Sequence, residues 1–244
     1  MDAACNVYWL GLVPYDEAWQ HQNRLAAEIA AGRQPPTLLL LEHPHTYTFG
    51  RSGHIENLLW DEAEMARRGV TVQWVDRGGD VTYHGPGQLV GYPLLSLGAM
   101  KMEVEAGQDT ARLPQADYIG YLRNLEVTLI AALSRLGVTS VQLPGLTGVW
   151  VQSGSESQPA KIAAIGIKVD ARGVTRHGFA LNVNPDMSYW DGIVGCGLKE
   201  YPVTSLAELL DWVPSMPEVK EALTDAFGKV FAYRMVTITL PVLP

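Results

Sequence analysis

The residue best suited to covalent chemistry is Cys196, which has a glycine on each side within the stretch 193–198, Ile-Val-Gly-Cys-Gly-Leu. Flanking glycines leave a thiol unshielded and allow the backbone to form an exposed loop. Cysteine attacks as its thiolate, and an ordinary thiol is only about 3% ionised at pH 7. Cys196 is therefore a candidate nucleophile that needs a neighbouring His or Lys to ionise it. The alternative is a buried, inert thiol.

Lys161 is a candidate for that neighbour. It begins the stretch 161–169, Lys-Ile-Ala-Ala-Ile-Gly-Ile-Lys-Val, which is otherwise apolar and predicts a strand. A lysine at the end of such a strand either extends into solvent, the more common case, or points inward as a functional amine. The sequence leaves both possibilities open.

Residues 77–88, Arg-Gly-Gly-Asp-Val-Thr-Tyr-His-Gly-Pro-Gly-Gln, form the most unusual segment. Its four glycines allow backbone N–H groups to approach a ligand closely. The segment is neither a P-loop nor a dinucleotide-binding fingerprint, because the Lys-Ser/Thr pair and the third glycine of those motifs are missing. It either binds a ligand or forms two tight turns around a hydrogen-bonded histidine.

A slot between two strands is the third candidate feature. The turn 170–173 is expected to join strands 161–169 and 174–183 into a hairpin, with a register that places Gly166 opposite His177. Both strands then lack bulky side chains around Gly166 and Gly178. An acyl tail would fit against the exposed backbone there.

Other site chemistries find less support. His43 and His45 could bind a metal only together with Cys196, and no CxxC, HExxH or carboxylate cluster accompanies them, so we expect no metal. No basic stripe interleaves with the aromatic residues, which are therefore expected in the core rather than on a base-stacking surface. These aromatic residues are Tyr47, Trp74, Tyr83, Trp150 and Trp190.

The elements that would position these residues alternate along the chain. Helices are predicted at 15–31, 61–68, 117–136 and about 217–231. Strands are predicted at 6–10, 38–42, 46–49, 71–75, 81–84, 88–94, 139–142, 149–152, 161–169 and 174–183, and at the C-terminus. Residues 81–84 and 88–94 flank Gly-Pro-Gly and predict a hairpin. The polar stretch 98–116 predicts a surface loop, and the Ser/Gly-rich stretch 153–158 a flexible turn.

Composition limits the class of protein. The 244 residues are 47% hydrophobic and 18% charged, typical of a globular chain, and we expect one catalytic domain over 1–244. The net charge of −8 disfavours nucleic acid and acidic membrane surfaces as partners. The most apolar run, 37–41, is too short for a membrane helix, and no signal-peptide pattern is visible, so we expect a cytoplasmic protein. The only two cysteines, Cys5 and Cys196, are expected to be free and reduced.

Four motifs taken together resemble the octanoyltransferases of lipoate biosynthesis. They are the stretch 77–94, the Lys161 strand, the stretch 177–182 (His-Gly-Phe-Ala-Leu-Asn) and the Cys-Gly-Leu at 196–198. The resemblance extends over about 10–210. It implies an α+β fold, with a mixed β-sheet, a second smaller sheet and surrounding helices, as in the biotin and lipoate protein ligases.

The resemblance also implies an activity. The family moves an octanoyl group from acyl carrier protein to a lysine of a lipoyl domain, through an acyl-cysteine intermediate and without a cofactor. By position, Cys196 matches the nucleophile and Lys161 the lysine that activates it. The segments that match the family's substrate pocket are Arg77, Gly78, Gly79, Asp80, Val81, Thr82, Tyr83 and His84, then Ala164, Ile165 and Gly166, and then Gly178, Phe179 and Ala180.

The implied partners are octanoyl-acyl carrier protein as donor, and as acceptors the lipoyl domains of 2-oxoacid dehydrogenase E2 subunits and the H protein of glycine cleavage, with the enzyme itself a monomer. Such partners are acidic, so this acidic chain would have to concentrate positive charge locally. The candidates for that charge are Arg51, Arg77, Lys168, Arg172, Arg176 and Lys199.

Gly195 departs from the family pattern, because many relatives have proline before the nucleophile, and we expect slower chemistry rather than none. Two other functions stay open. One is an ATP-dependent lipoate or biotin protein ligase, although no adenosine-phosphate motif is visible. The other is an acyl-binding or carrier-docking module without catalytic activity.

Overall fold

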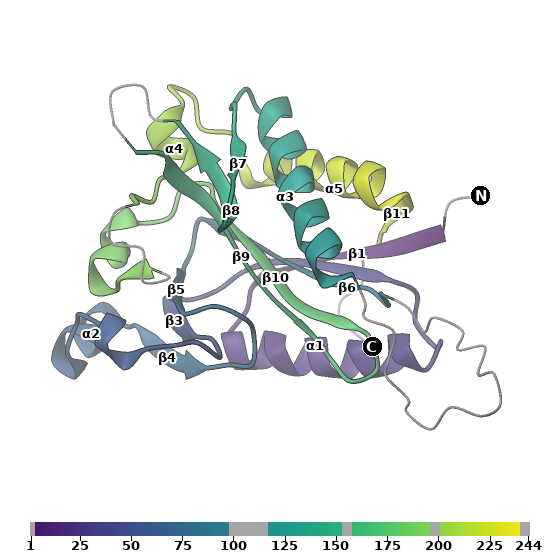
Figure 1. Ribbon diagram of the computed structural model, residues 1–244, viewed down its shortest axis with the longest axis horizontal. Coiled ribbons are helices and arrows are strands. Elements are labelled where there is room, and N and C mark those ends of the chain that lie inside the picture. The colour runs from purple at the N-terminus through teal and green to yellow at the C-terminus, as the bar shows by residue number, and fades with distance from the viewer. Residues whose placement is uncertain (1–2, 98–116, 153–157, 196–200, 240–244) are drawn as a thin grey trace.

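An eight-stranded mixed sheet forms the centre of the computed structural model, which describes residues 3–97, 117–152, 158–195 and 201–239 (Figure 1). The strand order is β11-β1-β2-β6-β10-β9-β8-β7. β1 pairs in parallel with β2 and β11, and all other neighbours in this sheet are antiparallel. The strands are β1 (Ala3–Leu12), β2 (Thr37–Glu42), β6 (Gln88–Leu94), β7 (Val141–Leu143), β8 (Leu146–Val151), β9 (Ala160–Val169), β10 (Thr175–Asn182) and β11 (Tyr233–Thr237).

Helices cover both faces of this sheet. α3 and α5 lie together on one face, and α1 runs along the other (Figure 1). Because successive side chains of a strand point to opposite faces, Leu38 and Leu40 of β2 pack in the core beneath α3 and α5, while Leu39 and Leu41 pack beneath α1. A strand buried on both faces has a continuous apolar run, as β2 has at residues 38–41. The helices are α1 (Tyr15–Ala30), α3 (Tyr118–Arg135) and α5 (Met216–Phe231).

A second, three-stranded sheet has the order β4-β3-β5 and its own core of Tyr47, Phe49, Val81, Tyr83 and Ile193. Its strands are β3 (Thr46–Phe49), β4 (Thr71–Trp74) and β5 (Val81–His84). Short helices accompany it and the end of the large sheet: η1 (Ile55–Asn57), α2 (Glu62–Arg68), η2 (Met187–Gly192) and α4 (Leu206–Leu209). The α+β architecture with a smaller second sheet is therefore as predicted.

The predicted hairpin between 81–84 and 88–94 is wrong, because β5 belongs to the small sheet and β6 to the large one. The turn between them binds to elements of the large sheet. The Gly87 N–H donates to the Glu42 carboxylate at 2.7 Å, and its carbonyl accepts from the N–H groups of Val183 and Asn184 at 3.2 and 2.9 Å. The turn therefore carries the chain from one sheet to the other instead of folding it back.

The predicted register of the β9–β10 hairpin is wrong by one residue. His177 pairs with Ile167, and Gly178 lies directly opposite Gly166. The turn has three residues instead of four, because the Asp170 N–H donates to the Val174 carbonyl at 2.9 Å and Gly173 takes a left-handed conformation with φ of +80°. The two glycines consequently open one continuous slot across both strands.

The four predicted helices are all present, and the strands agree apart from the two corrections above and shifted ends. The predicted loop at 98–116 and nearly all of the predicted turn at 153–158 lie outside the described residues. Within the described part of the chain, no helix is long and apolar enough to span a membrane.

A substitution at Gly91 tests how tightly the neighbouring strands β6 and β10 pack. Its partner on β10 is Phe179, whose ring occupies the position that a Cβ on Gly91 would take. We expect Gly91→Ala to lower the free energy of unfolding by about 1–3 kcal/mol through overpacking. Urea unfolding of Gly91→Ala, Phe179→Leu and the double variant checks this. The smaller leucine should recover part of the loss, and strictly additive effects would contradict the packing argument.

Candidate active site

The loop 76–80 reaches from the small sheet onto β9 of the large sheet. The Gly78 N–H donates to the Ile167 carbonyl at 2.9 Å. A Cβ on Gly166 would lie 3.0 Å from Arg77 Cδ and 3.1 Å from the Gly78 carbonyl oxygen, so the loop crosses β9 where that strand has no side chain. The buried Arg77 fixes the loop, because its Nη2 donates to the carbonyl and hydroxyl oxygens of Thr48 at 2.5 and 2.9 Å.

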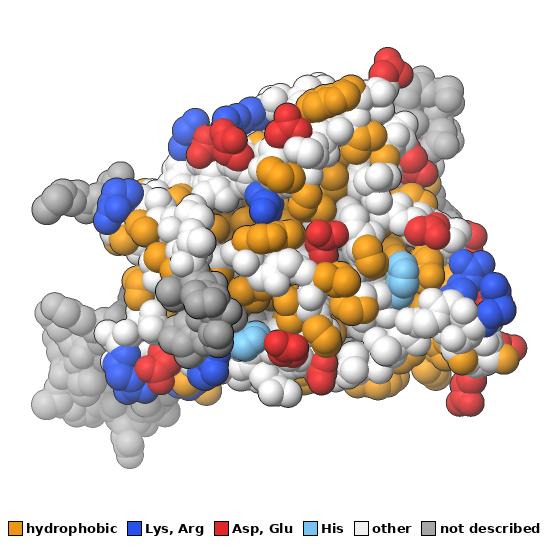
Figure 2. Space-filling model, turned by 180° about the vertical axis from the view of Figure 1, so that it is seen from behind, with side chains coloured by type: hydrophobic (Ala, Val, Ile, Leu, Met, Phe, Trp, Pro, Cys, Tyr) orange, Lys and Arg blue, Asp and Glu red, His pale blue; other side chains and the backbone are white. Residues whose placement is uncertain are grey.

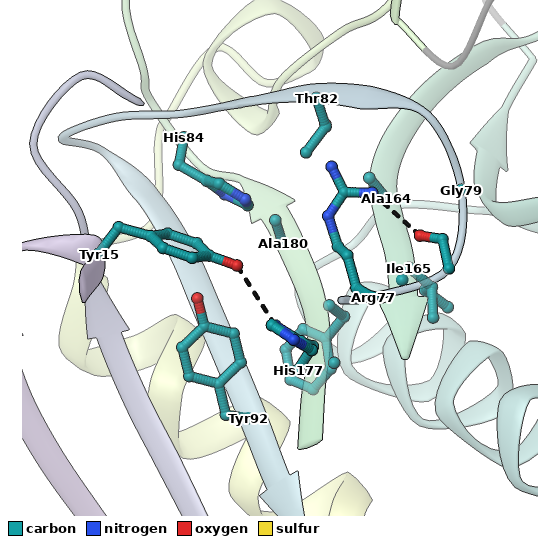
Figure 3. A pocket seen from close by; sticks show the side chains of 14 residues that line it. Tyr15, Arg77, Gly79, Thr82, His84, Tyr92, Ala164, Ile165, His177 and Ala180 are labelled. Carbon is teal, nitrogen blue, oxygen red and sulfur yellow. Dashed lines mark hydrogen bonds between the residues drawn. The ribbon is translucent and has the colours of Figure 1, made fainter. Parts of the chain in front are cut away.

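A cavity that we call the narrow cavity lies beneath this loop (Figure 3). Its volume is about 50 Å³. The predicted slot at Gly166 and Gly178 forms one wall, and the loop forms the other. Its lining residues are Tyr15, Arg77, Gly78, Gly79, Thr82, His84, Tyr92, Ala164, Ile165, Gly166, His177, Gly178, Phe179 and Ala180.

Residues 80–84 divide between the cavity and the core of the small sheet. Thr82 and His84 line the narrow cavity, whereas Val81 and Tyr83 are fully buried in the core, as the two-residue period of a strand requires. Asp80 anchors the preceding segment of the chain: its carboxylate accepts from the backbone N–H groups of His54 and Val81 and from the side chain of Asn57.

Tyr15, Tyr92 and His177 gather at one end of the narrow cavity (Figure 3). The Tyr15 hydroxyl donates to His177 Nδ1 at 3.3 Å, and His177 Nε2 donates to the Asp76 carboxylate at 2.7 Å. The Tyr92 hydroxyl donates to His43 Nε2 at 2.7 Å, and His43 Nδ1 donates to a backbone carbonyl. Sequence analysis did not select the two tyrosines, because they come from separate elements and carry no local signal.

The buried histidines at this end are neutral. Burial lowers the pKa of His43 to about 4 and lowers the pKa of His177, although the Asp76 carboxylate opposes the shift at His177. Burial also holds the pKa of His84 well below its usual range. The His177 and Arg176 hydrogen bonds in turn hold the pKa of Asp76 well below its usual value. A neutral, hydrogen-bonded cavity end suits an uncharged ligand.

Lys161 points inward instead of extending into solvent, because only 8% of it is exposed. Its ammonium lies 4.7 Å from the ring centroid of Trp150. Gly148 lies beside the lysine stem, and a Cβ there would clash with the Ala163 carbonyl oxygen at 2.7 Å. The fully buried Glu126 of α3 accepts from the Gly148 N–H at 3.0 Å and from Arg123 at 2.6 Å, which holds this part of β8 beside the lysine.

Lys161 lines a second cavity, which we call the lysine cavity, together with Thr82, Trp150, Ala164, Trp190, Gly195, Tyr201 and Val203. Cys196 lies outside the described residues, but Gly195 and Tyr201, the described residues on either side of 196–200, both line the lysine cavity. The chain leading to Gly195 is fixed, because the Val194 N–H donates to the Asn57 carbonyl at 2.8 Å. Cys5 is fully buried, and burial raises its pKa to about 12.

A third cavity, which we call the wide cavity, opens on the other side of the loop and has a volume of about 730 Å³. It shares Gly78, Gly79, Ile165 and Gly166 with the narrow cavity, and it also reaches Lys161. Its further lining residues are Ser52, His54, Glu56, Asn57, Asp80, Leu122, Gly145, Leu146, Thr147 and Ile167.

His43 and His45 are engaged in hydrogen bonds rather than placed as a metal pair. His43 bonds Tyr92 and a backbone carbonyl, while His45 Nδ1 lies 2.9 Å from the Tyr83 hydroxyl and its ring stacks 3.9 Å from that of Tyr189. Among the residues that the structure describes, no group of three or more His, Cys, Asp or Glu side chains could hold a metal ion.

Three of the six cations proposed for docking are engaged within the protein. Arg77 and Arg176 are buried, Arg176 with Asp76 as its ion-pair partner, and Arg172 pairs with Asp170 at 2.6 Å. On the face seen in Figure 2, the Lys and Arg side chains are scattered, most of them near acidic ones. Lys199 lies outside the described residues. A local concentration of positive charge therefore stays a prediction, with Arg51 and Lys168 as its described candidates.

Known proteins share this fold and much of this sequence. A family model described as lipoyl protein ligase A/B catalytic domain matches residues 14–228. The octanoyltransferase of Chloroflexus aurantiacus is 46% identical over 226 residues, 93% of each chain. That of Solibacter usitatus is 45% identical over 231 residues, 95% of this chain and 94% of the relative. The bi-partite lipoate protein ligase of Thermoplasma acidophilum has a TM-score of 0.68 at 19% identity, covering 97% of this chain and 88% of that one.

The sheets and helices are therefore those of the lipoate protein ligase fold. Within that class, the chain belongs to the octanoyltransferase family, part of the lipoyl protein ligase A/B catalytic domain family. The resemblance found in the sequence motifs is confirmed.

The neutral state of His43 predicts a pH dependence of stability. The unfolded histidine takes up a proton near pH 6.5, whereas the folded one does so only near pH 4, so its contribution is complete above pH 6.5 and is lost as the pH falls towards 4. Between pH 7 and pH 5 this amounts to about 2 kcal/mol. Urea unfolding at both pH values should show that much less pH dependence in His43→Gln. An unchanged difference between the two pH values would contradict the assignment.

Proposed function

We propose that this protein transfers an octanoyl group from acyl carrier protein to a lysine of a lipoyl domain, through a thioester on Cys196. One observation carries the proposal. The narrow cavity and the lysine cavity share Thr82 and Ala164, and Gly195 lines the lysine cavity beside Lys161. An acyl chain in the narrow cavity would thus end where an inward lysine and the residue preceding Cys196 come together.

The shape of the narrow cavity suits an unbranched acyl tail, and its volume of about 50 Å³ requires the cavity to widen as the chain enters. Backbone at Gly166 and Gly178 forms much of its wall, so only a thin ligand fits between the strands and the loop that crosses them. Arg77 is held by Thr48, and the histidines at the far end are neutral. An uncharged hydrocarbon chain would therefore meet no unpaired charge there.

In the first half-reaction, the Cys196 thiolate attacks the carbonyl carbon of the octanoyl thioester. A new carbon–sulfur bond forms, the carbonyl electron pair moves to oxygen, and collapse breaks the bond to the carrier's sulfur. That sulfur takes a proton from the Lys161 ammonium and leaves as a thiol, so Lys161 is neutral before the second half-reaction. The Lys161 ammonium supports this step, because a nearby cation favours the thiolate form of cysteine. The burial of Lys161 strengthens that electrostatic effect.

In the second half-reaction, the amine of the acceptor lysine attacks the acyl-cysteine. An amide bond forms, the thiolate of Cys196 leaves, and neutral Lys161 takes the proton that the attacking amine releases. The donor arrives already activated as a thioester, so no ATP is needed. The wide cavity, which reaches both Lys161 and the loop, gives a carrier arm or a substrate lysine room to enter.

The acceptors that we propose are the lipoyl domains of 2-oxoacid dehydrogenase E2 subunits and the H protein. In the proposed reaction, a lysine of each of these domains receives the octanoyl group, and no cofactor is required. An ATP-dependent ligase is the second candidate, because a lipoate protein ligase shares the fold. The octanoyltransferase relatives, at 45–46% identity, favour the transferase.

Mass spectrometry of the intact protein tests the covalent step. After mixing with octanoyl-acyl carrier protein, the wild type should gain one octanoyl group that hydroxylamine removes, and Cys196→Ser should gain no such thioester. Cys5→Ala serves as the matched control and should acylate normally, because Cys5 is buried away from the cavities. A wild type that stays unmodified while adenylating lipoate with ATP would support the ligase instead.

Lys161 variants separate the two tasks of that residue. Lys161→Ala should slow both half-reactions at least about 100-fold, because cation and base are both lost. Lys161→Arg should keep acylation of Cys196 within about tenfold but lose transfer to the acceptor, since arginine stays protonated. Single-turnover kinetics of each half-reaction give the answer. A fully active arginine variant in the second half would exclude the base role.

A further inference from the structure

Thr82 lies at the junction of the narrow cavity and the lysine cavity. Thr82 and Ala164 alone among the described lining residues belong to both the narrow cavity and the lysine cavity. With the acyl tail in the narrow cavity and the nucleophile near Lys161, the carbonyl group falls at the junction between them. Ala164 offers no polar side-chain atom there, so the Thr82 hydroxyl is the side-chain donor at this point.

The Thr82 hydroxyl has no hydrogen-bond partner within the described structure. It is buried, with 6% of the residue exposed, and its oxygen makes no hydrogen bond. A buried polar group without a partner costs about 1–3 kcal/mol, so native proteins keep few of them, and often for function. Valine would fill the same space without that cost.

The backbone holds this hydroxyl in one place. Thr82 lies in the middle of β5, paired with Thr48 of β3. On either side of it, Val81 and Tyr83 are fully buried in the core of the small sheet. Side chains of a strand alternate between faces, so the Thr82 side chain faces the cavities as firmly as its neighbours face the core. Such a fixed donor needs no reorganisation during a reaction.

The lysine cavity contains two further donors of this kind. The indole N–H groups of Trp150 and Trp190 are buried and have no hydrogen-bond partner within the described residues. Trp190 also contacts the chain next to the proposed nucleophile, since a Cβ on Gly195 would lie 3.1 Å from its ring. The surroundings of Lys161 thus present donors that no acceptor in the described part of the chain uses, as a site for developing negative charge requires.

We propose that the Thr82 hydroxyl is a catalytic group that donates a hydrogen bond to the thioester carbonyl oxygen and holds the oxyanion of both tetrahedral intermediates. The inference rests on the proposed function. As the thiolate or the amine attacks, the carbonyl electron pair moves to oxygen, and the Thr82 O–H bonds that oxygen while keeping its own proton. On collapse the electron pair returns to the carbonyl and the sulfur leaving group departs.

Single-turnover acylation by octanoyl-acyl carrier protein tests this role. Thr82→Val should acylate about 100-fold more slowly or worse, with little change in the half-saturating donor concentration, because the lost bond strengthens in the transition state. Thr82→Ser should stay within about tenfold of the wild type. Thr128→Val is the matched control: its hydroxyl bonds a carbonyl of its own helix, away from the cavities, and it should acylate normally.

Two further measurements exclude a structural explanation. Thr82→Val should unfold at the same or a higher temperature than the wild type, since it removes no hydrogen bond among the residues that the structure describes. The rate at which iodoacetamide alkylates Cys196 should be unchanged in Thr82→Val, because that reaction forms no oxyanion. Should Thr82→Val fail to fold, Thr82→Ala compared with Thr82→Ser supplies the same contrast, since both shorten the side chain and only serine keeps a hydroxyl.

The outcomes separate this inference from the proposed function. A wild type that forms the thioester, with Thr82→Val acylating at the same rate, overturns the role of Thr82 and leaves the proposed function intact. Equal losses in acylation and alkylation overturn it too, because they show a displaced nucleophile. A wild type that forms no thioester overturns the proposed function, and the role of Thr82 with it.

Discussion

One backbone hydrogen bond, from the Gly78 N–H to the Ile167 carbonyl, joins the two sheets where the cavities lie. It forms only because β9 has a glycine at 166, which lets the loop cross the strand at van der Waals distance. The narrow cavity lies beneath that crossing and the wide cavity opens on its other side. The site therefore depends less on any single functional group than on two pieces of backbone held at a fixed separation.

The sequence predicted the parts of the site that are local and missed those that depend on pairing. Glycines in the loop and at 166 and 178 were visible as a pattern, and the cavity uses them. The sheet change after Gly87 was not visible, because it depends on a carboxylate 45 residues earlier in the chain. The one-residue register error came from the turn length, which a single N–H of Asp170 decides. Tyr15 lines the cavity because α1 packs against the large sheet. The residues next to Tyr15 in the sequence do not predict that packing.

Charged side chains near the narrow cavity bond to other groups of the protein. Arg77 donates to the backbone carbonyl and the hydroxyl of Thr48 in the small sheet. Arg176 of β10 forms an ion pair with Asp76. The histidines nearby stay neutral through burial, which leaves the end of the narrow cavity polar in its bonding but uncharged. A chain with a net charge of −8 thus surrounds a pocket that suits an apolar ligand.

The hydrogen bonds that hold the strand beside Lys161 involve residues that do not contact the reacting atoms. Glu126 is fully buried on α3, and its carboxylate serves both Arg123 and the Gly148 N–H, beside which the lysine stem lies. The Arg123 side chain is 40% exposed, but losing it would leave the buried Glu126 carboxylate without this cation, which is more damaging than replacing both residues. Among descendants of this sequence, residues 123 and 126 should accordingly change together or not at all, so the lysine's surroundings constrain evolution on a helix whose charged pair takes no part in the chemistry.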